Sequence, residues 1–320
     1  MKNLFLKVVL FAICLPSGGI LLLKVYGFAQ MYTTAYTVFI PSLILLFALL
    51  WYCLKKHLQI FNLVLVGAVG GLIGTFGYDL IRVPFMLMGS RIFAPINMYG
   101  VWIADASYGS GFTDTIGWLY HFSNGITFGI LYALFMKGKS IWWAIAYALL
   151  LETIFVVSPF GELFGLTTKP LSLVAAYVGH IAYGYPLGRL TRDFDTTVES
   201  LKFFKKGLVA LSALVSLTVV ALIFSLKGAG QGDAILTIKD DIIEPHLLRL
   251  THGNSIRLKN NTDSQKILQI LMDEQEIELG PSAEASVIIP HPGIFQVRAI
   301  NVQGLKSVFI LSEPVENFKP

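Results

Sequence analysis

Long apolar runs dominate the first two thirds of this 320-residue chain and constrain it to a bundle of membrane-spanning helices. The hydrocarbon core of a bilayer is about 30 Å thick, so a crossing helix needs about 20 mostly apolar residues. Charged residues make up only 14% of the chain, against about a quarter in a soluble domain. Seven predicted spans meet the requirement: residues 5–26, 37–54, 61–80, 115–136, 141–158, 170–190 and 207–226.

Residues 84–112 form a different kind of apolar segment between the third and fourth predicted spans. Pro84, Pro95 and several glycines interrupt it, so it does not have the uniform pattern of a span. Such a segment is typical of an interfacial or re-entrant loop, which is tolerated only where protein or a water-filled cavity satisfies its backbone. Whether it crosses the membrane stays open at this stage.

Basic residues at the ends of the apolar runs set the predicted orientation. With the N-terminus in the cytoplasm, every basic cluster falls on the cytoplasmic side, as the positive-inside rule requires. We therefore expect a multi-pass protein of the cytoplasmic (inner) membrane with an extracytoplasmic C-terminus. The net charge of +4 belongs to this pattern and does not indicate nucleic-acid binding. The clusters are Lys2 and Lys7; Lys55 and Lys56; Lys137 and Lys139; and Arg189, Arg192, Lys202, Lys205 and Lys206.

The last quarter of the chain has the composition of a water-soluble domain. A glycine-rich linker at 228–232 separates a transmembrane domain at 1–227 from an extracytoplasmic domain at 233–320. About seven short apolar runs, separated by turn residues, predict a small all-β sandwich. Both cysteines, Cys14 and Cys53, lie in the apolar runs, so this domain has no disulfide framework.

The β-domain resembles the cupredoxins over about residues 233–313. The resemblance rests on Ile242-Ile-Glu-Pro245, Leu250-Thr-His-Gly253, the strand 256–263 that ends in Asn-Asn-Thr-Asp, and the closing hairpin from Pro292. It implies a cupredoxin-like sandwich as the fold of this domain.

Copper is not expected in that sandwich. A blue-copper centre requires two imidazoles and one thiolate, and the corresponding positions carry no such groups. His246, His252 and His291 lie in turns, where we expect them to be solvated. By the resemblance, the ligand positions fall on Lys266 or Ile267, Ala299, Val302 and Leu305.

Four ionisable residues lie inside predicted spans: Asp79, His121, Glu152 and His180. Such residues are costly in a membrane and are functional hypotheses by default. At about 1.5 Å of rise per residue, the predicted orientation places all four in the outer half of the bilayer. One site can therefore contain them if their spans are neighbours.

Several kinds of chemistry fit this set. A divalent metal would take His121, His180 and Glu152, with Asp79 as a fourth or outer ligand. A b-type haem would use His121 and His180 alone. A proton relay would use the imidazoles and carboxylates without a metal, and hydrogen bonding as structural glue is the plain alternative.

The sequence supports three functional interpretations. The first is metal or redox handling at the outer face of the membrane, and the second is a non-catalytic anchor that recruits an extracytoplasmic protein through the β-domain. The third is a transporter whose 84–112 segment lines a pathway. The chain contains no phosphate-binding glycine loop and no Ser-His-Asp ordering, so no enzymatic reaction is assigned.

Overall fold

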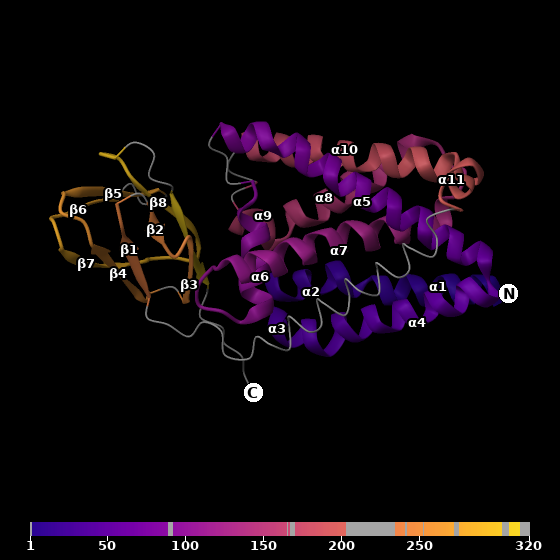
Figure 1. Cartoon of the computed structure of the whole chain (residues 1–320), viewed down its shortest axis with the longest axis horizontal. Helices are drawn as coiled ribbons and strands as arrows, with labels where there is room; N and C mark the ends of the chain where they lie inside the picture. The colour runs from indigo at the N-terminus through magenta and orange to yellow at the C-terminus, as the bar shows by residue number, and fades with distance from the viewer. Residues whose placement is uncertain are drawn as a thin grey trace. The chain divides into compact units, whose positions relative to one another are not determined.

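A computed structural model gives the fold of the chain (Figure 1). It divides into two compact units, one of Met1–Phe93 with Leu119–Ser225 and the other of Ala94–Trp118 with Leu226–Pro320. The predicted span 207–226 and the linker 228–232 lie outside the described residues and stay predictions. The structure describes residues 2–88, 92–164, 166, 170–202, 234–240, 242–251, 253–271, 275–302 and 307–313.

The described residues of the first unit are mainly helical (Figure 1). Its helix α7 begins in the second unit and continues here from Leu119. The elements are α1 Lys2–Cys14, α2 Pro16–Val25, α3 Met31–Thr34, the π-helix η1 Ala35–Phe39, α4 Ile40–Lys56, α5 Leu58–Leu87, α7 Gly111–Met136, α8 Ile141–Val157, α9 Pro159–Leu163, α10 Pro170–Arg192 and α11 Phe194–Ser200.

The apolar helices of this unit are those of a membrane protein. Asn3–Val25, Met31–Lys56 and Leu58–Leu87 are each long and apolar enough to cross a bilayer, and α8 is apolar but shorter. Helices α7, with 26 residues, and α10, with 23, are also long, and their crossing of a membrane stays a prediction. Large apolar side chains are exposed along these helices, as a lipid-facing surface requires; they include Ile44, Phe76, Leu80, Leu150, Val157 and Val174.

Glycines allow α5 and α7 to pack with their backbones in contact. A methyl group added to Gly71 of α5 would overlap the backbone of Gly125 of α7, and one added to Gly67 would overlap that of Gly129. Small residues at such positions are the usual basis of close helix packing in membranes.

Glycines also allow α10 to pack closely against α5 and α8. The Tyr183 side chain of α10 packs against Gly74 of α5, where a methyl group would overlap it, and the Tyr183 hydroxyl donates a hydrogen bond of 2.7 Å to the carbonyl of Gly125. On another face of α10, Gly184 and Gly188 lie against the start of α8. Helices α5, α7, α8 and α10 therefore form a tightly packed group, and these four helices carry all four predicted site residues.

The second unit contains a β-sandwich. Its sheets have the strand orders β2-β1-β4-β7 and β3-β9-β8-β5-β6. Strand β4 alternates exposed and buried side chains, and a buried core that includes Phe295 and Ile310 lies between the sheets. The described strands are β1 Ile235–Ile238, β2 Ile243–Glu244, β3 Leu247–Thr251, β4 Ser255–Asn260, β5 Lys266–Leu271, β6 Gln275–Leu279, β7 Glu284–Ile288, β8 Gly293–Ala299 and β9 Val308–Glu313.

The predicted sheet domain is confirmed, with two strands that the apolar pattern did not indicate. Strand β2 has only two residues, and β6 is rich in Glu and Gln, so neither has a long apolar run. Both lie at sheet edges, where fewer side chains need to be buried.

Residues 94–118, which follow α5, belong to the same unit as the β-domain. Pro84 does not end α5, which continues to Leu87, and α6 then occupies Ala94–Ala104. The side chains of α6 are almost all buried, and Gly100 packs against the backbone of Thr113 at the start of α7. The apolar character of α6 thus reflects burial within protein, as a broken apolar segment requires.

Candidate functional site

The first predicted pair of site residues is in direct contact. His121 of α7 has its Nε2 atom 3.0 Å and 3.1 Å from the two carboxylate oxygens of Asp79 on α5. Both side chains are largely buried. An imidazole that faces both oxygens of a carboxylate can donate its proton to either one, so the ring is held in a defined orientation.

The second pair lies between α8 and α10. The Nδ1 atom of His180 is 3.2 Å from the Oε2 atom of Glu152, which is only 5% exposed. The same nitrogen is 2.9 Å from the carbonyl oxygen of Ala176. Because a carbonyl oxygen can only accept, Nδ1 carries the proton and donates it, which leaves Nε2 of a neutral His180 as the proton acceptor.

Tyr78 connects the two pairs. Its ring centroid is 4.7 Å from that of His180 in an edge-to-face contact and 5.9 Å from that of His121. Gly179, next to His180 on α10, gives the Tyr78 ring the room to approach, since a methyl group there would overlap it. One aromatic ring therefore contacts both imidazoles of the site.

Arg82 supplies the positive charge of the site. Its Nη1 atom is 3.2 Å from Asp79 Oδ1, and its guanidinium carbon lies 4.5 Å and 4.6 Å from the ring centroids of Tyr78 and Phe93. The residue is 3% exposed, and its Nε atom is buried without a hydrogen-bond partner. A buried charge needs compensation, and Asp79 with the two aromatic faces provides it.

The structure thus brings the four predicted residues together as two pairs. Within the described ranges, no group of three His, Cys, Asp or Glu side chains could hold a metal ion. Sequence reasoning did not identify Arg82 or Tyr78 as site residues. The available signal was the spacing Tyr78-Asp79-x-x-Arg82, which places Tyr78 and Arg82 one turn apart on α5.

The positions that would hold copper in a cupredoxin carry other groups here. Lys266 begins β5, Ala299 ends β8 opposite Leu268, and Val302 follows in a bend. Leu305 lies outside the described residues. An ammonium and alkyl side chains are not copper ligands, so these residues do not fit a blue-copper centre.

The turn histidines of the β-domain differ from one another. His291 is exposed and donates from Nδ1 to the carbonyl of its neighbour Pro292, at 3.1 Å. His246 instead contacts Asp114 at the start of α7, with Nε2 3.1 Å from Oδ1. His252 lies outside the described residues.

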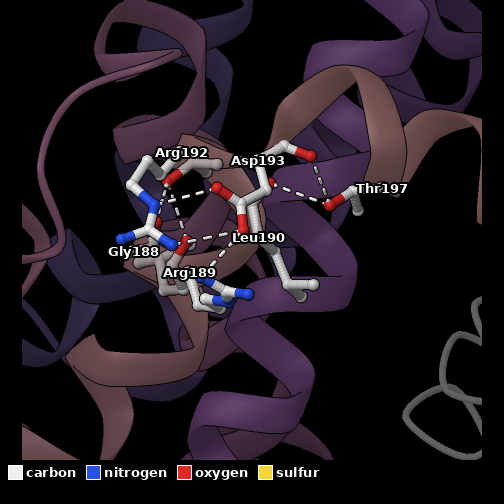
Figure 2. A network of polar contacts seen from close by, with 8 residues as sticks. Gly188, Arg189, Leu190, Arg192, Asp193 and Thr197 are labelled. Carbon is white, nitrogen blue, oxygen red and sulfur yellow. Dashed lines mark hydrogen bonds and ion pairs between the residues drawn. The ribbon is translucent and has the colours of Figure 1, made fainter.

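A second polar cluster joins α10 to α11 and is structural (Figure 2). Asp193 accepts from Arg189 at 3.0 Å and from Arg192 at 2.8 Å, and Thr197 donates to the carbonyls of Leu190 and Asp193. The ion pairs are solvent-exposed, and such pairs contribute about 0–1 kcal/mol. These contacts fix the turn between α10 and α11.

Comparisons with known proteins give a likeness for the β-domain alone. No family model matches the sequence, and no curated protein matches it. A purple cupredoxin from Nitrosopumilus maritimus is 10% identical, over 25% of this chain and 100% of that one, with a TM-score of 0.22. A reduced amicyanin variant is 11% identical, over 27% of this chain and 88% of its own, with a TM-score of 0.23. At these TM-scores the likeness decides nothing about function, and the architecture is that of a helical membrane unit joined to a β-sandwich.

Proposed function

We propose that this chain is a multi-pass membrane protein whose helical unit contains a proton relay. The observation that carries the proposal is the pairing of each buried imidazole with a carboxylate from a different helix, His121 with Asp79 and His180 with Glu152. Ionisable residues inside membrane proteins commonly serve as proton carriers. Pairs at hydrogen-bond distance satisfy the geometric condition for transfer.

The proposed transfer step conserves charge at the second pair. A proton that enters at His180 Nε2 makes an imidazolium beside the Glu152 carboxylate, and the Nδ1 proton then moves to Glu152 Oε2, which leaves a neutral ring and a carboxylic acid. Either state of the pair has no net charge, so the step avoids the large desolvation penalty of an isolated buried ion. His180 Nε2, the accepting nitrogen of the neutral ring, is the atom through which a proton enters or leaves the pair.

The first pair has a different role in this proposal. Arg82 compensates an ionised Asp79, so the Asp79 carboxylate is a fixed acceptor for the Nε2–H group of His121. The Tyr78 ring contacts both imidazoles. Electrostatic interactions among these groups are stronger in a buried site, where the local dielectric constant is low, than in water.

The membrane topology is part of the proposal. We infer seven spans, with the N-terminus in the cytoplasm and the β-domain outside the cytoplasmic membrane. The basic residues at the span ends support this orientation, and the six long helical stretches of the described chain fall on the first six predicted spans.

The test is proton flux into vesicles that contain the full-length protein. A potassium diffusion potential drives the flux, and an enclosed pH-sensitive dye reports it. We expect wild-type flux well above that of empty vesicles, a loss in Glu152→Gln and His180→Gln, and no change in His57→Gln. His57 is a suitable control because it lies outside the pairs and contacts Tyr52. Wild-type flux equal to that of empty vesicles would overturn the proposal.

Metal analysis and an absorption spectrum of the same preparation distinguish the relay from the metal and haem interpretations. The relay requires no bound metal or haem. Stoichiometric metal or a haem spectrum that disappears in a His121→Ala/His180→Ala double variant would replace the relay with a metal or haem site.

A recruiting role for the β-domain has an observation of its own. Strand β6 ends the five-stranded sheet and β7 ends the four-stranded one, and an edge strand can accept a strand from another protein. Cross-linking of the full chain, compared with a chain ending near Lys227, tests this role. Identical cross-linked partners in both would exclude it.

A further inference from the structure

Residues 107–109, which precede α7, form an added strand on the β-sandwich. The Gly109 amide donates to the carbonyl of Leu247 at 2.7 Å, and the Arg249 amide donates to that of Ser107 at 2.8 Å. Tyr108 pairs with Leu248 in an antiparallel bridge between these two bonds. Because β3 is the last strand of its sheet, this segment occupies the edge that β3 would otherwise expose.

A group of charged side chains, Arg249 with Asp105 and Glu313, reinforces the added strand and is the first clasp. Arg249 of β3 places Nη1 3.0 Å from Asp105, two residues before the added strand, and Nε 3.0 Å from Glu313, at the end of β9. The indole of Trp102 in α6 also donates to Glu313. Burial opposes the charge of Arg249, but the two carboxylates outweigh it and raise the pKa of the guanidinium above its ordinary value.

A second clasp reaches the first turn of α7. Asp114 Oδ1 lies 3.1 Å from Nε2 of His246 and 2.7 Å from the amide nitrogen of Asn97 in α6. Gly109 lies directly against the His246 ring, since a methyl group there would overlap it. The two clasps and the added strand together attach the stretch from Trp102 to Asp114 to the β-domain.

We propose that the β-domain is a positioning element for the first pair of the relay, and this inference rests on the proposed function. Asp114, which the β-domain holds, and His121, which the relay uses, lie seven residues apart on the unbroken helix α7. Seven residues correspond to about 10 Å of helix. Fixing the first turn of α7 therefore limits fraying of the two helical turns that lead to His121. This positioning role of the β-domain does not require copper ligands.

The experiment uses the full-length protein in lipid nanodiscs and the variant Arg249→Met. Its matched control is Arg298→Met on β8, an exposed arginine that bonds Gln269 within the same sheet. We expect amide hydrogen exchange over 105–114 to accelerate at least about tenfold in Arg249→Met, because charge-assisted hydrogen bonds are the strong ones. We expect no change there in the control.

The readout for positioning is the NMR spectrum of the isotope-labelled His121 ring. We expect its ring signals to shift in Arg249→Met and to stay unchanged in Arg298→Met. Unchanged exchange over 105–114 would show that Arg249 does not hold this stretch, and faster exchange with unchanged His121 signals would overturn positioning. Asp105→Asn, a milder change at an exposed residue, repeats the test if Arg249→Met fails to fold. If Arg249→Met shows both the faster exchange and the change at His121, but the wild type shows no proton flux, the proposed relay is wrong and the positioning of His121 by the β-domain is still supported.

Discussion

The α-carbon of Gly71 on α5 faces the carbonyl of Gly125 on α7 with no space for a side chain between them. The glycines at 67 and 129 continue the same contact one turn away. This contact aligns the helix that carries Asp79 with the helix that carries His121, eight residues beyond Gly71 and four residues before Gly125 respectively. The hydrogen bond between those two site residues depends on it.

Gly71→Val is therefore expected to destabilise the helical unit. The added side chain would overlap the α7 backbone, and overpacking of this kind typically costs about 1–3 kcal/mol. Thermal unfolding in detergent, followed by circular dichroism, measures the effect. Gly19→Val on α2 is the control, because a side chain there meets nothing within 4 Å. Equal midpoints for both variants would show that α5 and α7 do not pack as described.

The contact of Asp114 with His246 is expected to weaken in acid. Burial opposes the ionisation of Asp114, but hydrogen bonds from His246 and Asn97 outweigh it and hold the pKa of the carboxyl below its ordinary value. The stabilisation from a lowered carboxyl pKa is complete above the unfolded value, about 3.9, and is lost as the pH falls through the folded value.

Hydrogen exchange over 105–114 as a function of pH checks this expectation. After correction for the intrinsic pH dependence of exchange, protection in the wild type should decrease below about pH 4. Asp114→Asn should show lower protection at neutral pH and no further decrease in acid. A variant that keeps the acid-dependent loss would show that another group is responsible.

Phe295 should be essential to the stability of the β-sandwich. It is fully buried between the two sheets, and replacing such a residue with alanine costs about 3–5 kcal/mol. Chemical denaturation of the full chain, with circular dichroism in the β region, measures the change. Ile288→Ala, at a side chain that is 65% exposed, should change the stability by less than about 0.5 kcal/mol. Similar losses in both variants would contradict the described core.

If the proposed orientation is correct, an impermeant reagent outside the cell should label one of two introduced cysteines and not the other. Lys139→Cys follows the fourth predicted span and Asp263→Cys lies in the β-domain, and both positions are exposed. In intact cells, an impermeant maleimide should label Asp263→Cys alone. The native cysteines, Cys14 and Cys53, are buried and give little background. Labelling of both positions, or of Lys139→Cys alone, would contradict the orientation.

The sequence predicted the elements of this fold better than their contacts. Long apolar runs located the helices, and the ionisable residues inside them gave the candidate site residues Asp79, His121, Glu152 and His180. Their pairing was not predictable, because it depends on which helices are neighbours and on how each is rotated. The glycines of α5 were the available signal, since they lie on two faces that contact α7 and α10.

The attachment of residues 94–118 to the β-domain was beyond the reach of sequence patterns. Their apolar character is compatible with lipid, a cavity or a protein surface. The deciding contacts join residues far apart in the chain, such as Asp105 with Arg249. Hydrophobic periodicity describes one element at a time and does not contain this information.

The protonation of Glu152 tests the proposed relay most directly. Infrared difference spectra of the full-length protein in lipid, recorded between about pH 4 and pH 10, report a carboxylic acid by its carbonyl band, and NMR reports the His180 ring. The relay predicts a band that is absent in Glu152→Gln, that titrates together with His180 in the wild type and that changes its midpoint in His180→Gln. A Glu152 carboxyl that keeps one state across this range, or that titrates independently of His180, would contradict the relay.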